Sequence, residues 1–114
     1  MTTKRINSKA KGKTGELELA HYLTDHGYPA RRGQQFQGTP ESPDIICESL
    51  DKIHFECKRT EKAKLYDWMK QAQKDAGEKQ IPVVCHRRNN SEWLAILPLD
   101  KLLHILTYTE YVHL

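Results

Sequence analysis

The sequence predicts an α/β fold in which a mixed central β-sheet is flanked by helices. Three segments carry apolar residues at the three- and four-residue intervals of an amphipathic helix, and short β-rich runs lie between them. Glycine, proline and asparagine separate these segments, whose order is α-β-β-β-α-β-β-α. With 114 residues, 38% of them hydrophobic and 29% charged, the chain suits one globular domain whose core needs neither metal nor disulfides.

The first segment, residues 14–26, is predicted to be a helix that ends at Gly27. Its buried stripe would consist of Leu19, Ala20 and Leu23. Glu16 lies on that stripe one turn earlier, whereas Glu18 lies about 200° away on the wetter side of the helix. An inward-facing carboxylate needs a cation nearby, so we select Glu16 as the candidate site residue. The alternative is the simple preference for acidic residues near a helix N-terminus.

The first β segments surround a polar loop. We expect a short strand at residues 28–32, a loop at 33–42, a strand at 44–48, a turn at 49–52 and a strand at 53–58. The last two strands would form a hairpin, which would bring Asp44 close to Glu56. Phe36 is the one aromatic residue of the loop, where it could stack on a base, wedge into a branched DNA or anchor the loop itself.

The second half of the chain predicts two more helices and two more strands. In order, we expect a helix at 65–76 that ends at Gly77, strands at 81–85 and 92–97 joined by a turn at 87–90, a helix at 98–106 opened by Pro98, and a tail at 107–114. On the helix at 65–76 the inward residues would be Leu65, Trp68, Met69, Ala72 and Ala76, and the outward ones Lys70, Gln71, Lys74 and Asp75. The leucines of the last helix suit either the core or a dimer surface.

The strand at 53–58 carries the candidate chemistry. Its apolar and polar residues alternate, so Phe55 and Cys57 would lie in the core while Glu56 and Lys58 would lie side by side, roughly 6.6 Å apart, on the other face. Eleven residues separate Asp44 from Glu56. Hydrolysis of a phosphodiester with a divalent metal needs two carboxylates for the ion and a cation for the developing charge. This spacing supplies all three groups on adjoining strands.

The N-terminal segment is basic. Residues 1–13 contain no acid and five cations, Lys4, Arg5, Lys9, Lys11 and Lys13, within a chain of net charge +3. We expect this segment to be a mobile arm suited to a polyanion, followed by a single domain at 14–114. The alternative is a tail that only increases solubility.

The cysteines and the hydropathy indicate a cytoplasmic protein without a membrane span. The three cysteines, Cys47, Cys57 and Cys85, lie in apolar runs, so we expect reduced, buried side chains. A zinc site formed by these cysteines with His54 or His86 is the alternative, although no C-x-x-C pair is present. The first residues lack the apolar core of a signal peptide, and no apolar run reaches the roughly 18 residues of a membrane span.

The order of elements, together with several short motifs, resembles the PD-(D/E)XK nuclease superfamily and its restriction-endonuclease-like fold. Within it the chain is most similar to the archaeal-type Holliday junction resolvases and their phage relatives. The matching fragments are Lys11-Gly12, Glu16-Leu17-Glu18-Leu19, His26-Gly27-Tyr28, Arg32, Pro43-Asp44-Ile45-Ile46, Phe55-Glu56-Cys57-Lys58, Leu65-Tyr66, Ile81-Pro82-Val83-Val84 and Trp93. Two departures bear on the substrate: Leu17 stands where relatives often carry an arginine, and the loop at 33–42 is longer than in compact relatives.

The resemblance implies a catalytic site. Asp44 and Glu56 would bind Mg²⁺, for which we expect Mn²⁺ to substitute, and Glu16 would lie in the outer part of the metal site. Lys58 would be the catalytic lysine, and Arg32 would contact the scissile phosphate. The enzyme would be a homodimeric Holliday junction resolvase that nicks opposed strands of a four-way DNA junction and leaves 5′-phosphate and 3′-hydroxyl ends.

Further residues are expected to contact DNA: Lys9, Lys11, Lys13, Arg31, Arg32, Phe36 and Arg59. If residues 28–32 alternate, only one of Arg31 and Arg32 can enter the site, and the register from Gly27 favours Arg32. His54 could support the metal site or be a solvated residue at a strand end, and Gln71 could lie near the site. Two other functions stay open, namely the same chemistry on flaps, repair or restriction targets, and a DNA-binding module that does not cleave.

Overall fold

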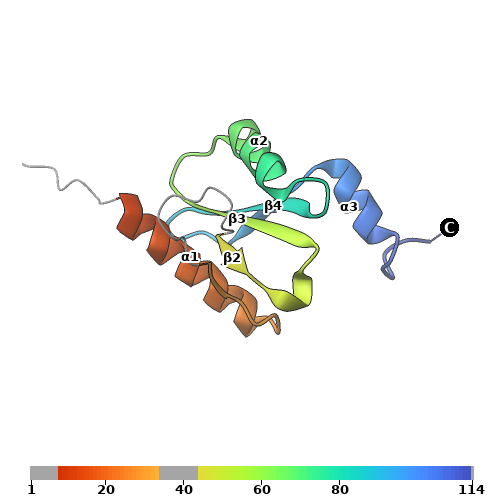
Figure 1. The fold of residues 1–114 in the computed structure, drawn as a ribbon, viewed down its shortest axis with the longest axis horizontal. Coiled ribbons are helices and arrows are strands. Elements are labelled where there is room, and N and C mark those ends of the chain that lie inside the picture. Colours follow the sequence, from red (N-terminus) through yellow and green to blue (C-terminus); the bar gives the residue numbers. More distant parts are fainter. Residues whose placement is uncertain (1–7, 34–43, 114) are drawn as a thin grey trace, which may run out of the picture.

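The computed structural model describes residues 8–33 and 44–113, and their side chains from residue 12 onward. The elements are α1 (Ser8–Asp25), β1 (Arg31–Arg32), β2 (Ile45–Ile46), a 3₁₀ helix η1 (Glu48–Leu50), β3 (Ile53–Arg59), α2 (Leu65–Ala76), β4 (Ile81–Arg87), β5 (Leu94–Ile96) and α3 (Leu99–Leu106). Apart from η1, this is the predicted order. The mixed sheet flanked by helices confirms the predicted fold class (Figure 1).

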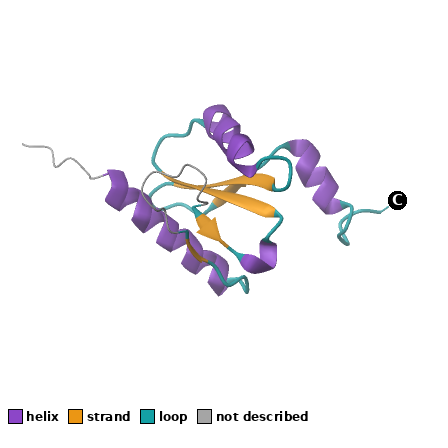
Figure 2. Cartoon of the chain, viewed as in Figure 1, coloured by secondary structure: helices purple, strands orange, loops and turns teal. Residues whose placement is uncertain are grey.

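The main sheet has the order β3-β4-β5 and is mixed. β3 and β4 are parallel and are connected through α2, whereas β4 and β5 form the predicted antiparallel hairpin. α1 packs on one face of the sheet around Leu19, Phe55 and Val83, and α2 packs on the other face, where Ala72 and Val84 are completely buried (Figure 2). β3 therefore has protein on both of its faces.

β2 does not form the expected hairpin with β3. Among the described residues, β2 pairs with β1 in a separate antiparallel ladder, with Arg31 opposite Ile46. The chain turns into η1 directly after β2, which ends the strand before a ladder with β3 can form. Asp44 nevertheless reaches β3 through its side chain, because its Oδ2 accepts a hydrogen bond of 3.0 Å from the backbone N–H of Cys57.

α1 begins at Ser8, six residues before the predicted start. It therefore includes residues 8–13 of the segment that we expected to be a mobile arm, while residues 1–7 lie outside the described part of the chain. The predicted end is confirmed, since Gly27 follows the helix with a φ of 93°, a conformation that glycine adopts without strain. Within the helix, Leu19 and Ala20 are buried as expected.

α2 and α3 have the predicted bounds to within one residue, but their packing differs. α2 buries Trp68, Ala72 and Ala76, whereas Leu65, expected to face inward, is exposed. α3 projects from one end of the sheet (Figure 1), and its residues Leu99, Leu102 and Leu103 are exposed, so they do not serve the core. None of the described helices has the length and apolarity needed to span a membrane.

Gly15 permits the close approach of α1 to β3. A Cβ atom at this position would lie 2.6 Å from the Cβ of Arg59, a distance that backbone-anchored atoms do not tolerate. Gly15→Ala should therefore destabilise the protein by about 1–3 kcal/mol, although alanine favours helix formation. Urea unfolding monitored by circular dichroism measures the change.

Gly12→Ala is the matched control, since Gly12 lies on the same helix and a Cβ atom added there would meet nothing within 4 Å. This substitution should stabilise the protein by about 0.5–1 kcal/mol through helix propensity alone. Equal stabilisation by both substitutions would contradict the close contact between α1 and β3.

Candidate metal and phosphodiester site

β3 presents alternate side chains to the two helices. Cys57 and Arg59 face Gly15 of α1, whereas His54, Glu56 and Lys58 face α2. We expected only the Phe55 and Cys57 face to lie in the core, but both faces are covered. Consequently Glu56 is only 4% exposed.

Asp44 and Glu56 form a close pair of carboxylates. Burial, followed by the neighbouring Glu56 carboxylate, raises the pKa of Asp44 to about 7, and Glu16 adds to the effect. Burial alone would raise the pKa of Glu56 too, but His54 and Asp44 hold it below its ordinary value. A partly buried and a buried acid therefore compete for one proton, which is the electrostatic situation that a bound cation relieves.

Arg32, not Arg31, faces the acidic residues. Its Nε donates a hydrogen bond of 2.8 Å to Oε1 of Glu16, and both side chains are largely buried. Arg31 points outward and forms an exposed ion pair of 3.3 Å with Glu48. The Arg32 guanidinium is thus the nearby cation that the inward position of Glu16 required.

Lys58 lies on the same face of β3 as Glu56. Its Nζ donates a hydrogen bond of 3.1 Å to Oε1 of Gln71 on α2. Gln71 was placed on the outward face of its helix by the sequence pattern, yet it reaches back over the edge of the sheet. The ammonium group of Lys58 is thereby held on the face of β3 that carries Glu56, whose pKa it helps to lower after the larger effects of His54 and Asp44.

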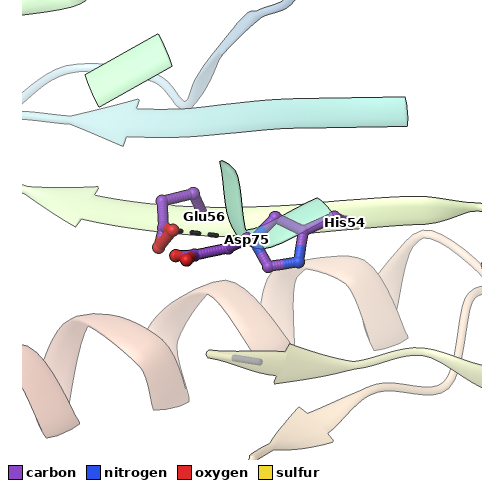
Figure 3. A group of neighbouring side chains, drawn as sticks. All are labelled: His54, Glu56 and Asp75. Carbon is purple, nitrogen blue, oxygen red and sulfur yellow. Dashed lines mark ion pairs between the residues drawn. The ribbon is translucent and has the colours of Figure 1, made fainter. Parts of the chain in front are cut away.

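His54, which is buried, and Asp75, which is exposed on α2, complete the polar cluster around Glu56 (Figure 3). His54 is 6% exposed, so the solvated strand-end alternative was wrong, and the Glu56 side chain raises its pKa. Asp75 was assigned to the outward face of its helix, and sequence reasoning missed it. The sequence did hold one signal. Gln71 was a candidate neighbour of the site, and Asp75 lies one helical turn further along the same side of α2, a spacing similar to that between Lys58 and Glu56 on β3.

A second set of charges lies on the α1 side of β3. Glu18, which we expected on the wetter side of its helix, is partly buried and accepts hydrogen bonds from Arg59 (3.3 Å) and Arg87. Arg59 also donates to Asn89 at 3.0 Å. Arg59, a predicted DNA contact, thus has acidic and amide partners within the fold. Among the other predicted contacts, Lys13 is exposed, the side chains of Lys9 and Lys11 are not described, and Phe36 lies outside the described residues.

The cysteines are free thiols. Cys47 and Cys85 are buried and Cys57 is partly buried, and burial raises the pKa of Cys85 to about 12. In the part of the chain that the structure describes, the group that could jointly hold a metal ion consists of His54, Glu56 and Asp75, with no cysteine. The cysteines therefore fit the predicted role as small buried side chains.

The acidic residues fit a divalent cation. Oε1 of Glu56 is buried and has no hydrogen-bond partner among the described residues, and Asp44 offers a second carboxylate in contact with it. Carboxylate oxygens are the ligands that Mg²⁺ and Mn²⁺ prefer. Two carboxylates beside a lysine are the groups that metal-assisted hydrolysis of a phosphodiester would need.

The chain belongs to the family described as "Phage putative PDDEXK endonuclease", whose family model matches residues 7–113. It is therefore a member of the PD-(D/E)XK nuclease superfamily. In the sequence, Pro43-Asp44 and Glu56-Cys57-Lys58 match the two halves of the PD-(D/E)XK motif. Comparisons with curated proteins and with solved structures gave no match.

Asp44→Asn should stabilise the metal-free protein by about 1–2 kcal/mol at pH 8. Asparagine keeps an oxygen for the Cys57 N–H and removes a charge that burial and Glu56 disfavour. The measurement is urea unfolding in EDTA. The same substitution should reduce the stabilisation that millimolar Mg²⁺ gives to the wild-type protein, because a ligand is lost.

The control is Asp51→Asn at an exposed position, which should change stability by less than about 0.5 kcal/mol in EDTA. A destabilised Asp44→Asn protein would show that the carboxylate is favourably paired in the metal-free state, contrary to the raised pKa.

Proposed function

We propose that this protein is a Mg²⁺-dependent DNA endonuclease that resolves four-way junctions by nicking two opposed strands. The observation that carries the proposal is the close pair of the partly buried Asp44 and the buried Glu56, with Lys58 on the same strand face as Glu56. Membership of an endonuclease family supports the chemistry. The resemblance of the motifs to junction resolvases supports the branched substrate, and the free cysteines support a cytoplasmic site of action.

Asp44 and Glu56 would hold the divalent ion, with Glu16 at the outer side of the site. The chemistry that the bound ion supplies is polarisation of the scissile phosphate and a lowered pKa of the attacking water. Asp44 keeps its orientation through the Cys57 N–H, so its position is fixed by the backbone of β3. Mn²⁺ should substitute for Mg²⁺ because both accept carboxylate oxygens.

Lys58 would stabilise the developing negative charge or orient the attacking water. Its hydrogen bond to Gln71 removes part of the freedom of a long side chain, which lowers the entropic cost of positioning the ammonium group. Arg32 would contact the scissile-strand phosphate, and its pairing with Glu16 fixes the direction of the guanidinium. In-line attack would leave a 5′-phosphate and a 3′-hydroxyl.

Cleavage of a synthetic four-way junction tests the proposal. With Mg²⁺ we expect paired, symmetric nicks that give ligatable duplexes, no cleavage in EDTA, and no cleavage of a linear duplex with the same arm sequences. Glu56→Gln and Lys58→Met should lower the cleavage rate by about 10²–10⁴-fold while junction binding persists, because the ion or the charge-stabilising cation is lost.

Glu78→Gln and Lys70→Met are matched controls at exposed positions and should cleave at the wild-type rate. Equal cleavage of junction and linear DNA would be consistent with the proposed metal site but would contradict the preference for junctions. Binding without cleavage at millimolar Mg²⁺ would instead favour the non-cleaving module.

A homodimer would place two sites on the two opposed strands of one junction. We propose α3 as the dimer surface, because Leu99 and Leu103 are 68% and 57% exposed. Sedimentation velocity at micromolar concentration should give a dimer for the wild-type protein, and Leu103→Lys should convert it to a monomer, since a buried lysine in an apolar interface is unpaired.

Leu94→Lys is the comparison variant, because Leu94 is a similarly exposed leucine on β5. It should remain dimeric. A wild-type monomer would count against paired nicking, and a dimer that survives Leu103→Lys would place the interface elsewhere.

A further inference from the structure

Two buried polar atoms on the α2 side of β3 lack hydrogen bonds. Nε2 of His54 and Oε1 of Glu56 have no hydrogen-bond partner among the described residues; at 3.6 Å they form an ion pair with each other when His54 is protonated, beyond hydrogen-bond distance (Figure 3). Both side chains are more than nine-tenths buried. Because an unsatisfied buried polar atom is costly, two that face each other point to a ligand between or beside them.

Asp75, on α2, adds a third possible metal ligand next to His54 and Glu56 (Figure 3). One ligand atom from each of His54, Glu56 and Asp75 lies within 4.8 Å of the other two. Ligands about 2.0–2.2 Å from one ion lie at most about 4.4 Å apart, so a small inward movement closes the group around a cation. The side chain of Asp75 is exposed on α2 and is free to make that movement.

We propose that His54, Glu56 and Asp75 form a second metal site that takes a Zn²⁺-like transition ion in preference to Mg²⁺. The site shares Glu56 with the Asp44 pair, and a carboxylate with two oxygens can serve two ions. An imidazole nitrogen with two carboxylates suits Zn²⁺ and related ions, whereas Mg²⁺ takes oxygen ligands. His54 would be the residue that sets this preference.

A cavity gives the ion a route from solvent. A cavity of about 220 Å³ adjoins the group and is lined by His54 and Asp75 together with Asp51, Glu48 and Gln80. Its acidic residues attract cations, and its position on the side of β2 and η1 separates it from Lys58. An ion can therefore reach His54 without passing the ammonium group.

The inference deepens the proposed nuclease site but does not need DNA cleavage for its test. Zn²⁺ and Mg²⁺ binding are each measured on the whole chain, by calorimetry for Zn²⁺ and by thermal stabilisation for Mg²⁺. In His54→Gln and Asp75→Asn we expect Zn²⁺ affinity to fall at least tenfold, and in His54→Gln we expect Mg²⁺ affinity to change less than twofold. His21→Gln and Asp67→Asn, exposed on α1 and α2, should bind both ions as the wild type does.

Asp44→Asn separates the two proposals, because it should weaken Mg²⁺ binding and leave Zn²⁺ bound through His54. Asp75→Asn keeps the test valid if His54→Gln does not fold, since Asp75 is at the surface. Unchanged Zn²⁺ affinity in Asp75→Asn would overturn the site. An equal loss of Zn²⁺ and Mg²⁺ affinity in His54→Gln would also overturn it, because His54 would then only position Glu56.

Discussion

The burial of β3 between α1 and α2 is the constraint on which the polar features of this protein depend. On a strand with one solvent-exposed face, Glu56 would cost little folding free energy, because water would solvate its charge. Here α1 and α2 cover the two faces, so the buried charge of Glu56 needs a partner from the protein or from a ligand, and the partly buried Lys58 and Arg59 also have partners. Lys58 meets this need through Gln71, whereas Glu56 meets two further carboxylates.

The two faces of β3 resolve this constraint differently. On the α1 face, Glu18 is matched by Arg59 and Arg87, so charges of opposite sign neutralise each other within the fold. On the α2 face and at the adjoining end of β2, the carboxylates of Asp44, Glu56 and Asp75 gather, and burial followed by the Glu56 carboxylate raises the pKa of Asp44. This gathering of carboxylates marks the second face as the place where an external cation stabilises the protein.

The sequence pattern predicted the order of elements, because helical and alternating periodicities differ and glycine marked two helix ends. It also predicted that Asp44 approaches Glu56 and that Arg32 faces the acids. It did not predict the partner of β2, since strand pairing is decided by long-range packing and not by local pattern. Asp75 was missed for a related reason: a helical wheel separates inward from outward residues but does not show which outward residues lie over the edge of a sheet.

The backbone hydrogen bond of 2.9 Å from the N–H of Gly33 to the carbonyl of Asp44 joins the two ends of the segment at 34–43. The ladder of β1 and β2 continues from this bond, so main-chain hydrogen bonds among the described residues hold Arg32 close to Asp44. Insertions or deletions in that segment therefore add little closure entropy and leave the acidic cluster in place. The length and composition of this segment can therefore vary while the main-chain bonds at its two ends keep Arg32 and Asp44 close to each other.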